Sequence, residues 1–163
     1  MAEPSDPFQP LLDDHEEFLE KLHELEAVLD EMMHTREANE GNRELLDESI
    51  RFFEDDLISH FAREDAIVLP PLEAAIGRFG TLVNVVVYEH EEIRREIAKF
   101  KEARSQLDGD KDPWPAIQEL NRHGIFTVQF LWDHFRKEKV SLFPTAAKSL
   151  SGEQLREIGR RLA

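Results

Sequence analysis

Hydrophobic residues recur every three or four positions along extended stretches of this chain. In the first stretch, residues 11–36, the repeat is carried by Leu12, Leu19, Leu22, Leu25, Leu29 and Met33. Such spacing places the apolar side chains on one face of an α-helix. The pattern therefore predicts an amphipathic helix, which Asp6 and Pro7 can begin and the polar segment ANEGN ends.

The same spacing returns in the rest of the chain and predicts four more helices, over residues 42–68, 81–107, 114–142 and about 152–162. Pro70 and Pro144 are expected to end the second and fourth helices, because proline lacks an amide hydrogen and clashes with the preceding turn. The segment DGDKDPWP separates the third helix from the fourth, and Ser151 with Gln154 forms a capping-box pattern before the last. The prediction is an all-α fold: an up-down-up-down four-helix bundle with a short extra C-terminal helix.

A chain of 163 residues is long enough for one domain with a sizeable core. We expect a single domain over residues 1–163, with the bundle core at about 11–144. The 35 acidic and 20 basic residues give a net charge of −15, which repels phosphate backbones and anionic lipid. Nucleic acid and membrane surfaces are therefore not expected partners.

Two further features of composition narrow the chemistry and the location. The chain has no cysteine, so a metal would have to be held by nitrogen and oxygen. The first residues show no basic region followed by an apolar run, and no stretch reaches the roughly 18 apolar residues of a membrane-spanning helix. A cytoplasmic location is expected.

A sequence repeat links the second and fourth predicted helices. The segment HFAREDAIVLP, which begins at His60, aligns with HFRKEKVSLFP, which begins at His134. This alignment pairs Glu64 with Glu138 at an offset of 74 residues, since 134 − 60 = 74. Both copies contain a histidine followed four positions later by a glutamate.

The first and third predicted helices carry the other part of the repeat. The segment DHEEF, with His15, resembles EHEEI, with His90, at an offset of 90 − 15 = 75 residues. Each half of the chain thus consists of a helix with one matching histidine and a helix with His-x3-Glu. A duplication of this kind predicts an approximate two-fold relation between the halves of the bundle.

The duplicated residues have the chemistry of a metal site. Positions i and i+4 of a helix lie on one face, so a histidine and a glutamate at that spacing can reach one interior point. A single His-x3-Glu is usually an exposed ion pair, but two copies in register inside apolar helices favour metal binding. Burying so many ionisable groups without partners would be costly, and two cations would compensate. The candidate ligands are His15, His60, Glu64, His90, His134 and Glu138.

The remaining aromatic and polar candidates are assigned to the surroundings of the site. His23, His34 and His123 are expected to lie outside it. The aromatic residues expected to form core and a dry wall are Phe53, Phe61, Phe130 and Phe135. The candidates for carboxylates that accept from the outer imidazole nitrogens are Asp56, Glu89 and Asp133.

At these residues the chain resembles the hemerythrin-like, or HHE cation-binding, family. The resemblance implies a four-helix bundle with a non-heme di-iron centre, and family members bind dioxygen, act on nitric oxide or peroxide, or sense iron and oxygen. It implies one iron at His15 and His60, a second at His90 and His134, and bridging carboxylates from Glu64 and Glu138. The same nitrogen and oxygen ligands would also accept manganese or zinc.

One position departs from the pattern of the oxygen-carrying hemerythrins. Those proteins have a further histidine one turn after the third-helix ligand, where this chain has Arg94. Arginine stays charged and cannot ligate a metal, so an open or water-filled coordination position is expected. Such a position favours inner-sphere reaction with a small oxidant over reversible oxygen carriage.

Two functional hypotheses follow. The first is a di-iron protein that binds or reduces dioxygen, peroxide or nitric oxide at the His/Glu-bridged centre. The alternative is a non-catalytic iron- or oxygen-responsive module, in which the metals order the bundle. In both hypotheses the expected partner is a small diatomic or peroxide ligand.

Overall fold

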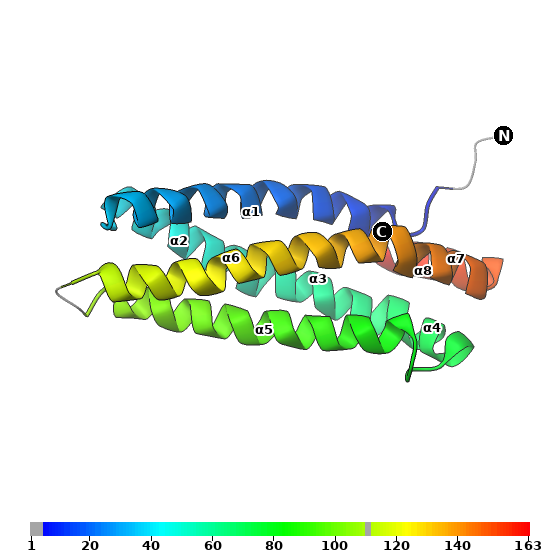
Figure 1. Cartoon of the computed structure of the whole chain (residues 1–163). Helices are drawn as coiled ribbons and strands as arrows, with labels where there is room; N and C mark the ends of the chain where they lie inside the picture. Colours follow the sequence, from blue (N-terminus) through cyan, green and yellow to red (C-terminus); the bar gives the residue numbers. More distant parts are fainter. Residues whose placement is uncertain (1–4, 110–111) are drawn as a thin grey trace.

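Each long hydrophobic repeat forms a helix in the protein, a computed structural model that describes residues 5–109 and 112–163. Four helical segments run side by side along the bundle, with a short helix at one end (Figure 1). In chain order the elements are α1 (Gln9–Thr35), α2 (Glu40–Arg51), the π-helical η1 (Phe52–Leu57), α3 (Ile58–Arg63), the π-helical η2 (Glu64–Val68), α4 (Leu69–Ile76), α5 (Leu82–Gln106), α6 (Trp114–Lys137), the π-helical η3 (Glu138–Leu142), α7 (Phe143–Ser149) and α8 (Gly152–Leu162). The predicted all-α bundle with an extra C-terminal helix is confirmed.

Polar side chains at helix starts satisfy amide groups that have no partner inside the helix. The Asn39 side chain accepts the Asn42 amide hydrogen at 2.8 Å and begins α2. Ser151 and Gln154 form the capping box predicted for α8, with bonds of 3.1 and 2.9 Å. The capping box of α8 was predicted from the sequence, whereas α2 begins at Glu40, two residues before the predicted start at residue 42.

The two prolines do not end their helices, contrary to prediction. The amide of Leu69, just before Pro70, bonds to the carbonyl of Glu64, five residues back, and Phe143 before Pro144 bonds to Glu138 in the same way. A proline ring clashes with the carbonyl four residues back in a regular α-helix, and a wider π turn relieves that clash. The second and fourth segments therefore continue to the ends of α4 and α7.

The polar candidates lie in a belt between two hydrophobic clusters. The larger cluster includes Leu22, Leu29, Phe53, Phe100 and Leu120, and the smaller one, at the end that carries α8, includes Phe8, Leu72, Phe143 and Leu162. On α1 the smaller cluster ends at Leu11 and the larger begins at Phe18, so His15 falls between them. On α5 the boundaries are Val86 and Ile93, with His90 between. The bundle thus surrounds its polar belt with apolar packing on both sides.

Gly124 lets α6 approach α1 and α5 closely. A Cβ atom at this position would lie 2.6 Å from Leu29 Cδ1 and 3.0 Å from Phe100 Cε2. Contacts that short require the Leu29 and Phe100 side chains to shift within a close-packed core. No helix in the described part of the chain is long and apolar enough to cross a membrane.

Candidate metal centre

All six predicted ligands are buried, and they come from all four long segments of the bundle. His15 extends from α1, His60 from α3 and His90 from α5. The remaining three lie at or beside the start of a π-helical segment: Glu64 begins η2, Glu138 begins η3, and His134 is in the last turn of α6. The prolines and the π turns that accommodate them thus occur in the same relation to the glutamate in both repeats.

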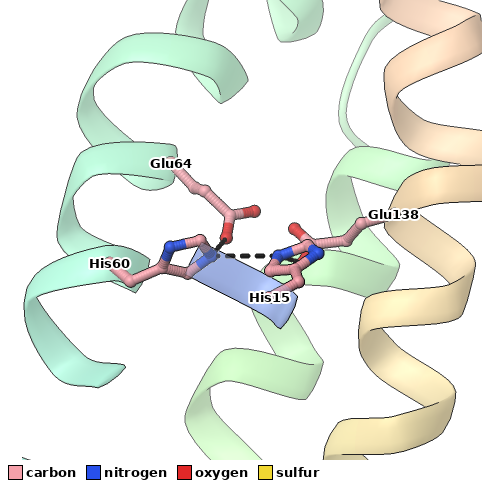
Figure 2. Close-up of side chains that lie close together, drawn as sticks. All are labelled: His15, His60, Glu64 and Glu138. Carbon is pink, nitrogen blue, oxygen red and sulfur yellow. Dashed lines mark hydrogen bonds and ion pairs between the residues drawn. The ribbon is translucent and has the colours of Figure 1, made fainter. Parts of the chain in front are cut away.

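The six side chains form two overlapping groups in which one ligand atom of each member lies within 4.8 Å of the others. The first group is His15, His60, Glu64 and Glu138, and the second is Glu64, His90, His134 and Glu138. Figure 2 shows the first group, with His60 and Glu64 on one segment pointing toward His15 and Glu138. Both glutamates belong to both groups, which is the arrangement that two bridged cations would require.

The Nε2 atoms of the histidines point into this cluster. His60 Nε2 lies 2.6 Å from Glu64 Oε1 and 3.1 Å from His15 Nε2. Glu138 Oε1 lies 3.3 Å from His15 Nε2 and 3.2 Å from His134 Nε2. The nitrogen and oxygen lone pairs therefore converge on a common interior volume.

Carboxylates fix the orientation of three of the four imidazoles. Asp14 accepts from Nδ1 of His60 at 2.9 Å, and Asp65 accepts from Nδ1 of His90 at 2.9 Å. In the second repeat, His134 Nδ1 donates to a carboxylate oxygen of Glu89 at 3.1 Å. Because a carboxylate accepts, the hydrogen of each neutral ring is on Nδ1 and the lone pair is on Nε2, toward the cluster.

The predicted outer carboxylates were right only for Glu89. In the described residues Asp56 and Asp133 accept no hydrogen bond from the clustered histidines, and Asp14 and Asp65 take that place. Each of these two aspartates adjoins a candidate ligand in the sequence but reaches a histidine on a neighbouring helix. A signal for Asp14 was present in the repeat, because it and Glu89 hold the same position before His15 and His90.

A basic side chain lies behind each of the three outer carboxylates. Asp14 contacts Arg63 at 3.4 Å, Asp65 contacts Arg94 at 3.2 Å, and Glu89 contacts Lys137 at 2.7 Å; these are the cation–carboxylate pairs of the site. Arg94, at the position of the additional hemerythrin histidine, is thus directed to Asp65 and is not a member of either ligand group. The three outer carboxylates are thus each paired with a basic side chain outside the ligand cluster.

The cluster contains buried polar atoms that no protein group satisfies. Among the described residues, the buried atoms without a hydrogen-bond partner are both carboxylate oxygens of Glu64, both of Glu138, and Nε2 of His90 and of His134. The short contact between Glu64 and His60 is an ion pair without the alignment of a hydrogen bond. Unsatisfied buried groups normally destabilise a protein by about 1–3 kcal/mol each. Their convergence at one point fits cation binding by nitrogen and oxygen ligands.

Burial and charge set the protonation of the cluster in the metal-free protein. Burial lowers the pKa of His60, but Glu64 and Asp14 outweigh it and raise the value to about 9. Burial raises the pKa of Glu64, but His60, followed by His90 and His134, lowers it to about 2. Burial and then the charge of His60 lower the pKa of His15 to about 4, and burial also lowers that of His134. His60 and Glu64 are thus a charged pair at neutral pH, beside two neutral imidazoles.

Two phenylalanines cover the imidazoles on their faces. Phe61 stacks on His90 with ring centroids 4.1 Å apart, and Phe135 stacks on His15 at 4.2 Å. Each follows the His-x3-Glu histidine of its own repeat and covers a histidine of the other. The predicted dry wall is present, although Phe130 lies only at the edge of the core.

The other histidines lie outside both ligand groups, as predicted. His123 contacts Glu96 at 2.8 Å and Glu119 at 3.2 Å, which satisfies both ring nitrogens. His34 and His23 are exposed.

Comparison with known proteins gives the family of this chain. Residues 6–146 match the Hemerythrin HHE cation binding domain. The chain belongs to this family. It is also 28% identical over 93 residues to the iron-sulfur cluster repair protein DnrN of Neisseria gonorrhoeae, over 55% of this chain and 57% of that protein. The match thus spans little more than half of the relative. Membership of the HHE family and the His/Glu groups together indicate a metal site.

Proposed function

We propose that this HHE domain holds two iron ions in a non-heme di-iron centre that binds or reduces a small oxidant: dioxygen, peroxide or nitric oxide. In this proposal His15 and His60 would hold one ion, His90 and His134 would hold the other, and Glu64 and Glu138 would serve both. The observation that carries it is the sharing of both glutamates between two ligand groups.

The choice of iron rests on the donor atoms and on the relatives. Imidazole and carboxylate ligands suit iron, and geometry and availability select among the divalent metals that such a site accepts. The similarity to a protein named for iron–sulfur cluster repair supports iron over manganese or zinc.

The iron ions would supply the redox and Lewis-acid chemistry, and the protein side chains supply the rest. The outer carboxylates Asp14, Asp65 and Glu89 orient the rings. The rings of Phe61 and Phe135 exclude water from two imidazole faces. The protein therefore provides a preorganised, dry set of ligands.

The ligand count leaves room for a substrate. Two imidazoles and two carboxylate oxygens per ion are fewer than an octahedral shell contains, and open positions are typical of non-heme iron sites that react with oxygen species. Arg94 is held by Asp65 at 3.2 Å and adds no ligand. This arrangement supports inner-sphere binding of the oxidant.

A second candidate function is a non-catalytic iron- or oxygen-responsive module. It is favoured by the position of the cluster, which takes ligands from all four long segments and separates two hydrophobic clusters. Metal binding at such a point would couple directly to the order of the whole bundle. For either function we propose one domain over residues 1–163, because Phe8 and Leu162 share one hydrophobic cluster. We also propose a cytoplasmic location.

The proposal is tested by loading the purified protein with Fe(II) under anaerobic conditions and measuring iron per chain and the visible spectrum. Two irons per chain, and consumption of added oxygen, peroxide or nitric oxide that continues while an added reductant supplies electrons, support the first function. Two irons with metal-dependent stability and no turnover support the second. A chain that retains no iron contradicts both.

Matched histidine variants make the result specific. His60→Gln should lose iron, whereas His123→Gln, at a histidine outside both ligand groups that is satisfied by Glu96 and Glu119, should retain it. Equal iron contents in the two variants would contradict the assignment of ligands.

A further inference from the structure

We infer that the two metal positions are not equivalent, and that the ion held by His15 and His60 exchanges with solution before the ion held by His90 and His134. The inference rests on the proposed di-iron centre. It concerns the residues outside the ligand set, where the two repeats differ.

Most of the outer residues obey the repeat. Asp14 and Glu89 correspond, and each accepts from the second-helix histidine of its own repeat. Arg63 and Lys137 also correspond, since 63 + 74 = 137, and each contacts the carboxylate of its repeat. His60 and His134 therefore have equivalent supports, and the difference between the halves must arise elsewhere.

The difference is at Asp65, which orients His90. The position that corresponds to it is 65 + 74 = 139, where the chain has Lys139. The carboxylate of Asp65 accepts from His90 Nδ1 at 2.9 Å and is held by Arg94 at 3.2 Å. His15 has no hydrogen bond to Nδ1 from any residue in the described ranges. Lys139, at the corresponding position, is exposed.

The absence of an outer carboxylate behind His15 weakens metal binding in the first half. A carboxylate on the outer nitrogen makes an imidazole a stronger and better-oriented ligand, and its loss typically lowers metal affinity 10–100-fold. Lysine has no acceptor atom, so Lys139 cannot replace the carboxylate that Asp65 supplies in the other half. The bridging glutamates are common to both ions and do not compensate. His15 is therefore the weakest of the four imidazole ligands.

The surface above the first half also differs from its counterpart. A groove beside His60 is lined by the acidic residues Asp14, Glu17, Asp55 and Asp56 and by the basic residue Arg63. The corresponding positions in the second half are Glu89, Glu92, Gln129 and Phe130, which carry two acidic side chains instead of four. Negative charge concentrates cations locally. This face thus supports exchange at the half that already has the weaker ligand.

The test is the release of iron from the full chain loaded anaerobically with Fe(II). An excess of a ferrous chelator is added, and the coloured complex is followed with time. We expect two phases of equal amplitude, one iron each, with rates that differ at least about tenfold. Far-UV circular dichroism of each variant checks that the helices are intact.

Two variants assign the phases to the two halves. Asp65→Asn removes the acceptor charge behind His90 and should accelerate the slow phase about tenfold without changing the fast one. Lys139→Asp places a carboxylate at the position that corresponds to Asp65 and should slow the fast phase by a similar factor. Lys148→Asp is the control, because it makes the same charge change at an exposed residue further along the chain and should change neither phase.

The outcomes separate this inference from the proposed function. A chain that binds fewer than two irons contradicts the di-iron centre itself. Two irons released in one phase, or a Lys139→Asp variant that slows only the slow phase, overturns the inequivalence and leaves the di-iron centre intact. Lys139 is exposed, so its variant tests the inference even if Asp65→Asn fails to fold.

Discussion

Replacing Glu138 by glutamine should stabilise the metal-free protein and destabilise the metal-loaded one. Both oxygens of this buried carboxylate are without a hydrogen-bond partner in the described structure. Its two imidazole neighbours, His15 and His134, have lowered pKa values and are neutral at pH 7.5. Without a metal, neither of these two imidazoles gives the carboxylate a positive charge, and the charged His60 of the same ligand group is paired with Glu64 at 2.6 Å.

The size of the effect follows from the two burial costs. An uncompensated buried carboxylate costs several kcal/mol, whereas a buried amide without partners costs about 1–3 kcal/mol. Glu138→Gln should therefore raise the free energy of unfolding of the metal-free protein by about 2 kcal/mol. In the loaded protein the bridging ligand is lost, and a fall in metal affinity of about 100-fold removes about 2.7 kcal/mol of stabilisation.

Glu64→Gln is the matched control, because it is the same substitution at the equivalent position of the other repeat. Glu64 lies 2.6 Å from His60, whose pKa is raised to about 9, so the two form a charged pair. Breaking a buried pair by removing one partner costs about 3 kcal/mol. This variant should therefore be less stable than the parent both with and without metal.

The assay is urea unfolding at pH 7.5, followed by far-UV circular dichroism, with EDTA or with Fe(II) under anaerobic conditions. The prediction is a change of sign between the two conditions for Glu138→Gln only. If Glu138→Gln destabilises the EDTA-treated protein as much as Glu64→Gln does, Glu138 is a structural ion-pair partner and the reasoning is wrong.

Three further predictions concern packing and pH. Gly124→Ala should lower the free energy of unfolding by roughly 1–3 kcal/mol, because its Cβ would lie 2.6 Å from Leu29 Cδ1. The control is Gly159→Ala, which has no contact under 3.4 Å and should stay within about 1 kcal/mol of the parent. Equal losses of stability for the two variants in urea unfolding would contradict this prediction. The raised pKa of His60 stabilises the folded protein below pH 6.5, and this stabilisation is lost as the pH rises through about 9. The lowered pKa of His15 stabilises the folded protein above pH 6.5, and this stabilisation is lost as the pH falls through about 4. Thermal unfolding in EDTA should thus give the highest Tm at about pH 6–7, and a maximum at pH 5 or 9 would count against it. Iron-loaded protein should release its metal below about pH 6, because histidine must be neutral to bind; dialysis at pH 4 that leaves the iron content unchanged would contradict this.

Much of the fold could be predicted because its signals are local. The spacing of apolar residues marked the long helices, and Ser151 with Gln154 marked the start of α8. The prolines misled the prediction, because the rule that proline ends a helix assumes regular α geometry. The π turns that begin at Glu64 and Glu138 accommodate Pro70 and Pro144, and no simple sequence pattern announces such turns.

The six clustered side chains and the carboxylates that support them also differ in how far they could be predicted from the sequence. The six clustered residues were accessible from the sequence because a duplication repeats their spacing. The supports of the histidines were not, because Asp14 and Asp65 reach across to neighbouring helices. Their partners depend on how the helices are rotated against one another, which is a property of the packed bundle. Arg94 was predicted not to be a ligand, but its contact with Asp65 emerged only from the packing.

The most direct test of the central claim is a crystal structure of the iron-loaded protein with anomalous scattering measured at the iron edge. Two iron peaks are expected inside the bundle, one at bonding distance from Nε2 of His15 and His60 and one from Nε2 of His90 and His134, with Glu64 and Glu138 between them. A single peak, or peaks away from these side chains, would contradict it.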